Sequence, residues 1–542
     1  MQFLDVETRR ELGFDAVWQR IKPVSPLGRA KQREAQAFLP EQASQLEGAW
    51  LLLEQAANCL RERPHAVQNL LYFLSQLRDI STIIERSNQG GVLDDVELYE
   101  VKKLLFLAEE IQGELDRLAW SFLLPDSLDL CPQCREALSV GQGRKTSFYL
   151  ADAYDEQLAA LRRRRRALEE QLAQFRENVD SKVREVVGRP LSFDDEITVS
   201  CAAGQAVQKL ETMPELVKVE EARGTITFRL VDSPEAQQLR LELGAVQEKE
   251  DACKARLRAR LSQIVGAHAS RLLRILEMLG FLDFLLAKAQ FCVEIQGVRP
   301  RLSTQLRLAI DQGRHLLVEE EVQRAGRRYQ PITLGLHAGV TVITGPNMGG
   351  KTVGLKTIGL LTAMAQYGLL VPAADMELSP RRWIRAHLAS RPVQGLSKFA
   401  EEMAFVREVL VCGDQEGLVL LDELAHGTNP TEGAAVAQAI VERLRSEPVI
   451  SVITTHYPAL ARVEGVSHYR VKGLPKGSLQ KAALPQFAKG LDGLQQLMDY
   501  TLEPASPHET GASDAALVAE ALGLEPGIIA RAKELQRSES HG

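Results

Sequence analysis

A glycine-rich segment constrains the fold of this 542-residue chain more than any other feature. It reads Gly345-Pro346-Asn347-Met348-Gly349-Gly350-Lys351-Thr352, and the apolar, β-branched run 340–344 precedes it. A helix-like run, 353–361, follows directly. A strand, such a loop and a helix together form a phosphate-binding unit, because backbone N–H groups and the helix N-terminus point at the phosphates. The segment therefore predicts an α/β nucleotide-binding domain.

The second apolar run, 417–421, ends in the acidic pair Asp422 and Glu423. Buried parallel strands deliver polar residues to the carboxyl edge of the sheet, where ligands bind. Lys351 would then reach the β- and γ-phosphates, while the Thr352 hydroxyl and Asp422 would hold Mg²⁺. Glu423 would orient and polarise the attacking water as a general base. Two solvated acids at a strand end are the alternative interpretation.

A third β-branched run, 449–455, ends at His456, after one intervening helix-like segment. The same sheet edge is expected for this residue, which predicts that His456 senses the γ-phosphate. A structural or exposed histidine is the alternative. With ATP and Mg²⁺ as the expected substrate and cofactor, the three segments predict an ATPase that converts ATP and water to ADP and phosphate.

The loop, the acidic strand end and the Thr454-to-Tyr457 segment together resemble those of the MutS ATPase family. Residues 364–373 and 395–403 are also similar to family segments. The resemblance implies an α/β P-loop ATPase domain of the ABC type. It also implies that Asn347 helps to order the γ-phosphate and water. Ser397 would contact the nucleotide of the other subunit, so that composite sites form across a homodimer.

One stretch, Gly427 to Gly433 with the small residues after it, resembles the second type of MutS protein. That branch has no mismatch-reading domain, so standard mismatch recognition is not expected. The chain departs from the family at Ala425 and His426, where a glycine and a small or basic residue are usual. Second-type members typically continue into a small nuclease domain, and the end of the chain at Gly542 predicts none here.

The rest of the chain has helical periodicity that predicts a core and two long arm helices. Apolar residues from Leu158 to Val186 follow coiled-coil-like steps, so 152–187 is expected to be one helix and about 236–290 a second. Between them, 216–220 and 225–230 alternate like strands around Arg223-Gly224, a hairpin signal. The expected domains are a helical core at 1–150, a lever at 151–300 with a clamp at about 188–233, the ATPase domain at 301–505, and a helix–turn–helix dimerisation segment at 506–542.

The charged residues of the arm and clamp do not decide whether the partner of the arms is DNA or a protein. The run Arg162–Arg166 in the first arm helix could bind DNA phosphates, or it could be a solvated face pairing with Glu169 and Glu170. The clamp is acidic, with Asp194, Asp195, Glu196, Glu211, Glu215, Glu220 and Glu221. We therefore consider two functions. The first is a dimeric ATPase that engages duplex or branched DNA and couples ATP state to arm movement. The second is an ATPase that remodels a protein, such as a reactivase for an adenosylcobalamin-dependent aminomutase.

Composition excludes several other classes. The net charge of −7 argues against a wholly basic nucleic-acid binder, although a local basic stripe stays possible. No apolar run approaches the length of a membrane span, and the first residues do not form a signal peptide, so a cytoplasmic protein is expected. Cys131 and Cys134 are the one close cysteine pair, and without a second pair we interpret them as structural thiols rather than a metal or redox site.

Overall fold

The computed structural model describes residues 2–142, 147–346, 350–388, 398–412, 415–473, 498–506, 519 and 524–539. The fold is mixed α/β and divides into two compact units. Unit 1 comprises Met1–Gln76, Glu114–Asp126 and Leu279–Gly542. Unit 2 comprises Leu77–Gly113 and Ser127–Met278. In sequence, unit 2 is therefore inserted into unit 1.

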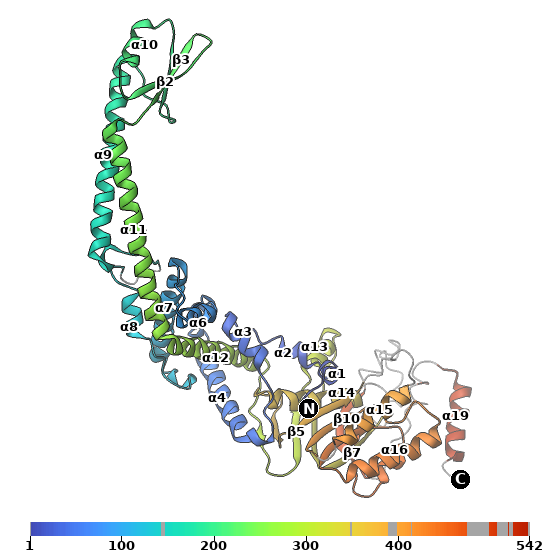
Figure 1. Ribbon diagram of the computed structural model, residues 1–542. Helices are drawn as coiled ribbons and strands as arrows, with labels where there is room; N and C mark the ends of the chain where they lie inside the picture. Colours follow the sequence, from blue (N-terminus) through green and yellow to red (C-terminus); the bar gives the residue numbers. More distant parts are fainter. Residues whose placement is uncertain are drawn as a thin grey trace. The chain divides into compact units, whose positions relative to one another are not determined.

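Both units contain several helices (Figure 1). Helices α7 (Asp95–Leu118) and α12 (Ala269–Glu294) each contribute residues to both units. Among the described residues, the other α-helices of unit 1 are α1 (Val6–Glu11), α2 (Phe14–Trp18), α3 (Pro26–Glu34), α4 (Ala43–Glu62), α5 (Val67–Ser75), α13 (Leu316–Arg324), α14 (Gly350–Gln366), α15 (Lys398–Val411), α16 (Pro430–Arg445) and α19 (Pro526–Glu539). Those of unit 2 are α6 (Ser81–Asn88), α8 (Pro132–Ala137), α9 (Glu156–Val187), α10 (Gly204–Glu211) and α11 (Pro234–Ala267).

A six-stranded sheet with the order β13-β12-β7-β11-β10-β9 forms the centre of unit 1. Its strands are β7 (Gly339–Thr344), β9 (Trp383–His387), β10 (Gly417–Leu421), β11 (Val449–Thr454), β12 (Ser467–Gly473) and β13 (Asp499–Pro504). All neighbours are parallel except β13, which pairs antiparallel with β12. Strands β10 and β11 are buried at every residue, as expected for parallel strands covered on both faces.

A second, four-stranded sheet and the N-terminal segment complete unit 1. Strands β4 (Arg301–Leu302), β5 (Arg307–Gly313), β6 (Ile332–His337) and β8 (Asp375–Leu378) have the order β4-β8-β5-β6. The N-terminal segment extends the central sheet, since the Ile384 N–H donates to the Phe3 carbonyl at 2.9 Å. The buried indole of Trp50 donates to the Ala365 carbonyl at 2.9 Å. Residues more than 300 positions apart thus share one core.

Helices α9 and α11 run side by side in unit 2 (Figure 1). They are antiparallel, because Gln157 near the start of α9 meets Arg256 near the end of α11. The expected helix at 236–290 is instead two helices, α11 and α12, that meet at His268. The His268 imidazole approaches the Ile264 carbonyl at 2.9 Å, and its backbone (φ −107°, ψ 10°) leaves the helical region. A side chain that competes for the last carbonyls explains the break.

A small sheet lies at the end of the two arm helices (Figure 1). Strands β2 (Leu216–Ala222) and β3 (Thr225–Leu230) form the predicted hairpin, and β1 (Glu196–Ser200), which we did not predict, pairs with β3. Arg223 (φ 52°) and Gly224 (φ 79°) both have left-handed backbone, as the tight turn requires. Val179 and Val183 of α9 pack in the core of this sheet.

Candidate functional site

Three adjacent strands of the central sheet bring the predicted site residues to one edge. Strand β7 leads into the loop that begins at Gly345, β10 leads into Asp422, and β11 leads towards His456. Because β7, β11 and β10 are neighbours and parallel, their carboxyl ends coincide. Strand β12 lies on one side of β7 and strand β11 on the other, although β12 directly follows β11 in the sequence. Open α/β sheets bind ligands at such points, where the strand order reverses.

The described ends of the glycine loop show why glycine is needed there. Gly345 has φ +140°, and a Cβ on it would lie 2.9 Å from the Val471 side chain and 3.2 Å from its backbone nitrogen. A Cβ on Gly350 would lie 2.8 Å from the Tyr500 ring. Pro346 is described between them, whereas 347–349 lie outside the described residues, so no geometry is assigned to Asn347, Met348 or Gly349.

A hydroxyl and a carboxylate oxygen from two different elements meet at the start of α14. The Thr352 hydroxyl donates to Oδ2 of Asp422 at 2.6 Å. Thr454, the last residue of β11, donates from its hydroxyl to Oδ1 of Asp422 at 2.5 Å and accepts the Glu423 N–H at 2.8 Å. Hard oxygen donors of this kind suit Mg²⁺, which takes one or two protein ligands together with phosphates. Thr352 and Asp422 therefore fit the predicted metal role.

Lys351, His456 and Glu423 form a second chain of contacts beside the first. Lys351 is 4% exposed, and its ammonium donates to the Gly345 carbonyl at 3.0 Å and lies 3.2 Å from Nε2 of His456. The same Nε2 lies 3.1 Å from Oε1 of Glu423. Burial lowers the pKa of Lys351, whereas Glu423 and Asp422 act to raise it. A buried lysine ammonium at the start of a helix that follows a glycine loop is suited to bind phosphate.

The backbone after the acidic pair is unusual. Glu423 (φ 54°) and Ala425 (φ 60°) both lie in the left-handed region, which glycine adopts more readily than either of these residues. Two side chains hold the turn: the Glu402 carboxylate accepts the Ala425 N–H at 2.7 Å, and the Tyr457 hydroxyl donates to the Ala425 carbonyl at 3.1 Å. Burial raises the pKa of Glu402 to about 7, although the Ala425 N–H opposes this. The His426 ring centre lies 5.6 Å from that of His456.

The structure thus brings together most of the predicted site residues. Ser397 lies outside the described residues, so its role stays a prediction. Sequence reasoning gave no role to Thr454 or Glu402. A polar residue at the end of a fully buried, mostly apolar strand was a usable signal for Thr454. No sequence pattern pointed to the contact between Glu402 on α15 and Ala425 on a distant turn.

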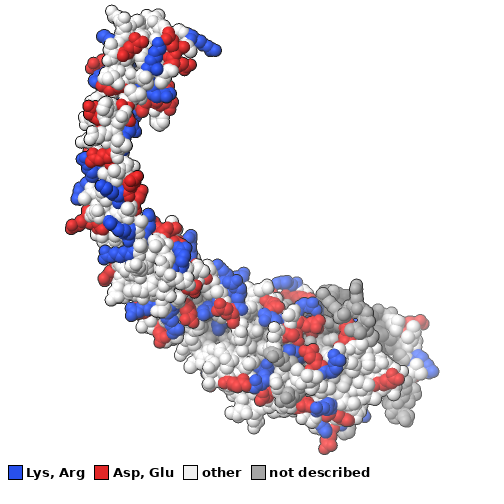
Figure 2. Space-filling model, in the orientation of Figure 1, with Lys and Arg blue, Asp and Glu red and all other residues white. Residues whose placement is uncertain are grey.

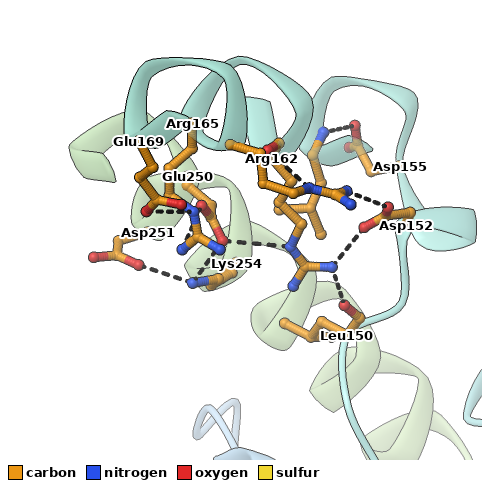
Figure 3. A network of polar contacts seen from close by, with 11 residues as sticks. Leu150, Asp152, Asp155, Arg162, Arg165, Glu169, Glu250, Asp251 and Lys254 are labelled. Atoms are coloured by element: carbon orange, nitrogen blue, oxygen red, sulfur yellow. Dashed lines mark hydrogen bonds and ion pairs between the residues drawn. The ribbon is translucent and has the colours of Figure 1, made fainter. Parts of the chain in front are cut away.

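The arginine run of the arm is held mainly by acids of the neighbouring helix (Figure 3). Glu250 of α11 is 2% exposed and lies 3.3 Å from both Arg162 and Arg165. Arg162 also donates to Asp152 at 2.7 Å and to the Leu150 carbonyl at 2.7 Å.

The other arginines of the run follow the same pattern. Arg164 pairs with Glu242 at 2.5 Å, and Arg165 with Glu169 at 3.6 Å. Arg163 alone of the five has no ion pair within the described part of the chain. The arrangement favours the structural interpretation of this run over a continuous phosphate-binding stripe.

Acids of the clamp are also partly neutralised. Figure 2 shows positive and negative side chains interspersed over the arm and its end. Asp195 pairs with Arg176 at 2.7 Å and Glu215 with Lys182 at 2.9 Å. Further pairs join Glu196 to Arg229 and Lys218 to Glu221. The clamp is therefore less negative than its acid content alone indicated.

Cys131 and Cys134 are buried thiols at the start of α8. Burial raises the pKa of Cys131 to about 11 and that of Cys134 to about 12, so both stay protonated at neutral pH. Among the described residues, no cluster of three or more His, Cys, Asp or Glu side chains could hold a metal ion. In the same part of the chain, no helix is long and apolar enough to cross a membrane.

Comparison with known proteins places this site in a family. The family model described as MutS domain V matches residues 341–486, which contain most of β7 together with Lys351, Asp422 and His456. The chain belongs to the MutS family.

Its similarity is to MutS2 proteins in particular. Endonuclease MutS2 of Geobacillus thermodenitrificans is 31% identical over 98% of this chain, and that of Thermomicrobium roseum is 29% identical over 98%. Endonuclease MutS2 of Staphylococcus aureus is 28% identical over 85% of this chain and 62% of its own length. The chain spans about 65% of the length of the first two relatives. It is therefore a MutS2-like member of the family.

Proposed function

We propose that this chain is a Mg²⁺-dependent ATPase with a P-loop domain of the ABC type, which works as a homodimer on DNA. The observation that carries the proposal is the convergence of Lys351, Thr352, Asp422, Glu423 and His456 at one sheet edge. These side chains come from three strand ends and supply a phosphate-binding cation, two oxygen ligands and a general base. Membership of the MutS family supports the ATPase activity.

The shared nitrogen of His456 suggests how the site changes when ATP binds. Nε2 can donate to Glu423 or accept from Lys351, but not both at once. With ATP present, Lys351 would turn to the β- and γ-phosphates, and His456 Nε2–H would be free to donate to Glu423 or the γ-phosphate. Filling the site thus orients the base.

Hydrolysis would then follow from the remaining groups. Glu423 accepts a proton from a water molecule as the water oxygen attacks the γ-phosphorus. The bond between the γ-phosphorus and the β,γ-bridging oxygen then breaks to give ADP and phosphate. Mg²⁺, held by Thr352 and Asp422, would neutralise charge on the phosphates. Thr454 keeps the two acids in place by bonding to both residues.

Dimerisation and arm movement complete the proposal. Ser397 would reach the nucleotide of the second subunit, and the 506–542 segment would pack on that subunit. The lever at 151–300 would move with the ATP state of the domain at 301–505. The antiparallel pair α9 and α11, with its own charge network, supports a stiff lever. The name shared by the relatives, an endonuclease, supports DNA as the partner rather than a protein client.

Substitution of the base tests the ATPase. Glu423→Gln should bind ATP like the unaltered protein while phosphate release falls at least a hundredfold, because a general base contributes roughly that factor. Lys351→Ala should lose ATP binding itself. Glu432→Gln, on the exposed first turn of α16, is the matched control and should hydrolyse normally. Hydrolysis by Glu423→Gln at the unaltered rate would refute the assignment.

DNA binding is tested separately, by titrating duplex and branched DNA at two salt concentrations. Affinity should fall steeply with salt, because phosphate contacts release counterions. A protein without salt-sensitive affinity for either DNA would point to the protein-remodelling alternative. In that case ATP-dependent restoration of an inactivated aminomutase becomes the decisive assay.

A further inference from the structure

A cavity of about 600 Å³ opens between the first three helices of unit 1 and the end of α14. Its lining comes from α1, α2, α3, the α2–α3 loop and Tyr367. None of the lining residues belongs to the candidate ATP site. Volumes of roughly 300–1,000 Å³ are usual for small-ligand sites. The composition of the walls indicates which ligand this one suits.

Four cations line the cavity: Arg9, Lys22, Arg29 and Arg33. Asp15 is the one carboxylate in the lining, and Arg9 already pairs with it at 2.6 Å. Within the described part of the chain, Lys22, Arg29 and Arg33 make no ion pair with a carboxylate. The cavity lining therefore carries an excess of positive charge in a chain whose net charge is −7.

Neutral carbonyl groups hold the two arginines of α3 in place. Arg29 donates to the Val24 carbonyl at 3.1 Å, and Arg33 donates to the Arg29 carbonyl at 3.3 Å. The positive charge of Arg29 acts to lower the pKa of the buried Asp283. The oxygens of Asp283, however, accept hydrogen bonds from Ser25 and from the Val24 N–H. Both guanidinium groups are thus oriented while further N–H donors stay available, as suits an anion.

An aromatic wall accompanies these charges. Trp18 is partly exposed and packs edge-on against Tyr367, with ring centres 5.1 Å apart. Its indole N–H has no acceptor among the described residues. Gln32 donates its amide N–H groups to the Trp18 and Ile21 carbonyls at 3.0 and 2.8 Å, which fixes the loop and leaves its own oxygen as an acceptor. Rigid aromatic rings with a polar edge are the usual surface on which nucleobases stack.

We propose that this cavity is a second nucleotide site, which binds an aromatic base with two or more phosphates. The base would pack on Trp18 and exchange hydrogen bonds with Gln32, while Arg29, Arg33 and Lys22 hold the phosphates. Free nucleoside diphosphates and the end of a single nucleic-acid strand share this chemistry. The proposal does not depend on the ATPase assignment, since the two sites have no residue in common.

Tryptophan fluorescence provides the test. Trp18 is partly exposed, whereas Trp50, Trp120 and Trp383 are buried, so a ligand in the cavity should alter mainly the signal of Trp18. The full chain carrying Lys351→Ala is titrated with ADP, with pyrophosphate and with a single-stranded oligonucleotide. We expect saturable quenching by ADP and weaker binding of pyrophosphate, which lacks the base. Competition of the oligonucleotide with ADP would identify a strand end as an occupant of the same site.

Charge reversal separates the cavity from general electrostatics. R29E/R33E should weaken ADP binding at least tenfold, because charge-assisted hydrogen bonds to phosphate are lost. The control R10E/K31E makes the same charge change on α1 and α3 at positions that do not line the cavity, and should bind within about twofold of the parent. Circular dichroism checks that each variant is folded. Absence of saturable quenching, or ADP binding by R29E/R33E equal to that of its control, would overturn the proposal.

Discussion

Removal of the Glu250 carboxylate is the sharpest test of how the arm is held together. Glu250 is 2% exposed and contacts three cations: Lys254 at 2.9 Å, and Arg162 and Arg165 at 3.3 Å each. Burial raises the pKa of Glu250, but the hydrogen bond and charge of Lys254, with both arginines, outweigh it and lower that pKa below its ordinary value. In Glu250→Ala three cations would face one another without their common anion (Figure 3).

The expected loss of stability depends on how far the three cations are exposed to solvent. Breaking a fully buried pair costs about 3–5 kcal/mol. Here the cations keep 21–34% of their side-chain surface exposed. They also have substitutes in Asp152, Glu169 and Asp251. We therefore expect a loss of about 2 kcal/mol in the local stability of the arm.

Hydrogen exchange over α9 and α11 measures this loss directly. A loss of about 2 kcal/mol corresponds to roughly 30-fold faster exchange of the slowest amides, when exchange follows local opening. Glu242→Ala is the matched control, because its pair with Arg164 is 44% and 48% exposed and should contribute less than about 1 kcal/mol. If Glu250→Ala exchanged no faster than Glu242→Ala, the interpretation of Glu250 as the central anion of the arm would be wrong.

Three further outcomes concern the ATPase half. Thr454→Val keeps the shape but removes both hydroxyl bonds to the acidic pair, so kcat should fall about tenfold with little change in ATP affinity, as single-turnover assays would detect. Glu402→Gln should melt a few degrees above the unaltered protein at pH 8 but not at pH 5. The raised pKa of about 7 means that the unaltered protein loses stability as the pH rises from 4.5 towards 7, whereas glutamine does not titrate. Gly417→Ala should destabilise the sheet by about 1–3 kcal/mol in thermal melts, because its Cβ would lie 2.3 Å from the buried Trp383 ring.

Prediction from the sequence worked best where a short local segment indicates both the strand and the functional residue after it. The runs before Gly345 and His456 are rich in β-branched residues, the run before Asp422 is apolar, and each leads into a chemically distinctive residue. Parallel pairing alone was then enough to predict that these ends meet, as the contacts among Lys351, His456 and Glu423 illustrate. The hairpin at Arg223-Gly224 was predictable for the same local reason.

Long-range partners were not accessible in this way. Glu250, which contacts Arg162, is 88 residues away on α11. From the sequence, pairing of the arginine run was therefore considered only with acids of the same helix. The contact of Glu402 with Ala425 depends on a left-handed turn that no propensity indicates at an alanine. The helix break at His268 depends on one imidazole finding a nearby carbonyl, which periodicity does not register.

The insertion of unit 2 into unit 1 has a consequence for synthesis on the ribosome. Phe3 and Trp50 emerge early, yet their partners Ile384 and Ala365 follow more than 300 residues later. At roughly 5–20 residues per second, that gap lasts from about 15 seconds to about a minute. Unit 2 is complete in the nascent chain before the central sheet exists. The first 76 residues must therefore wait with apolar surface uncovered, which makes them the natural point of contact for a chaperone during translation.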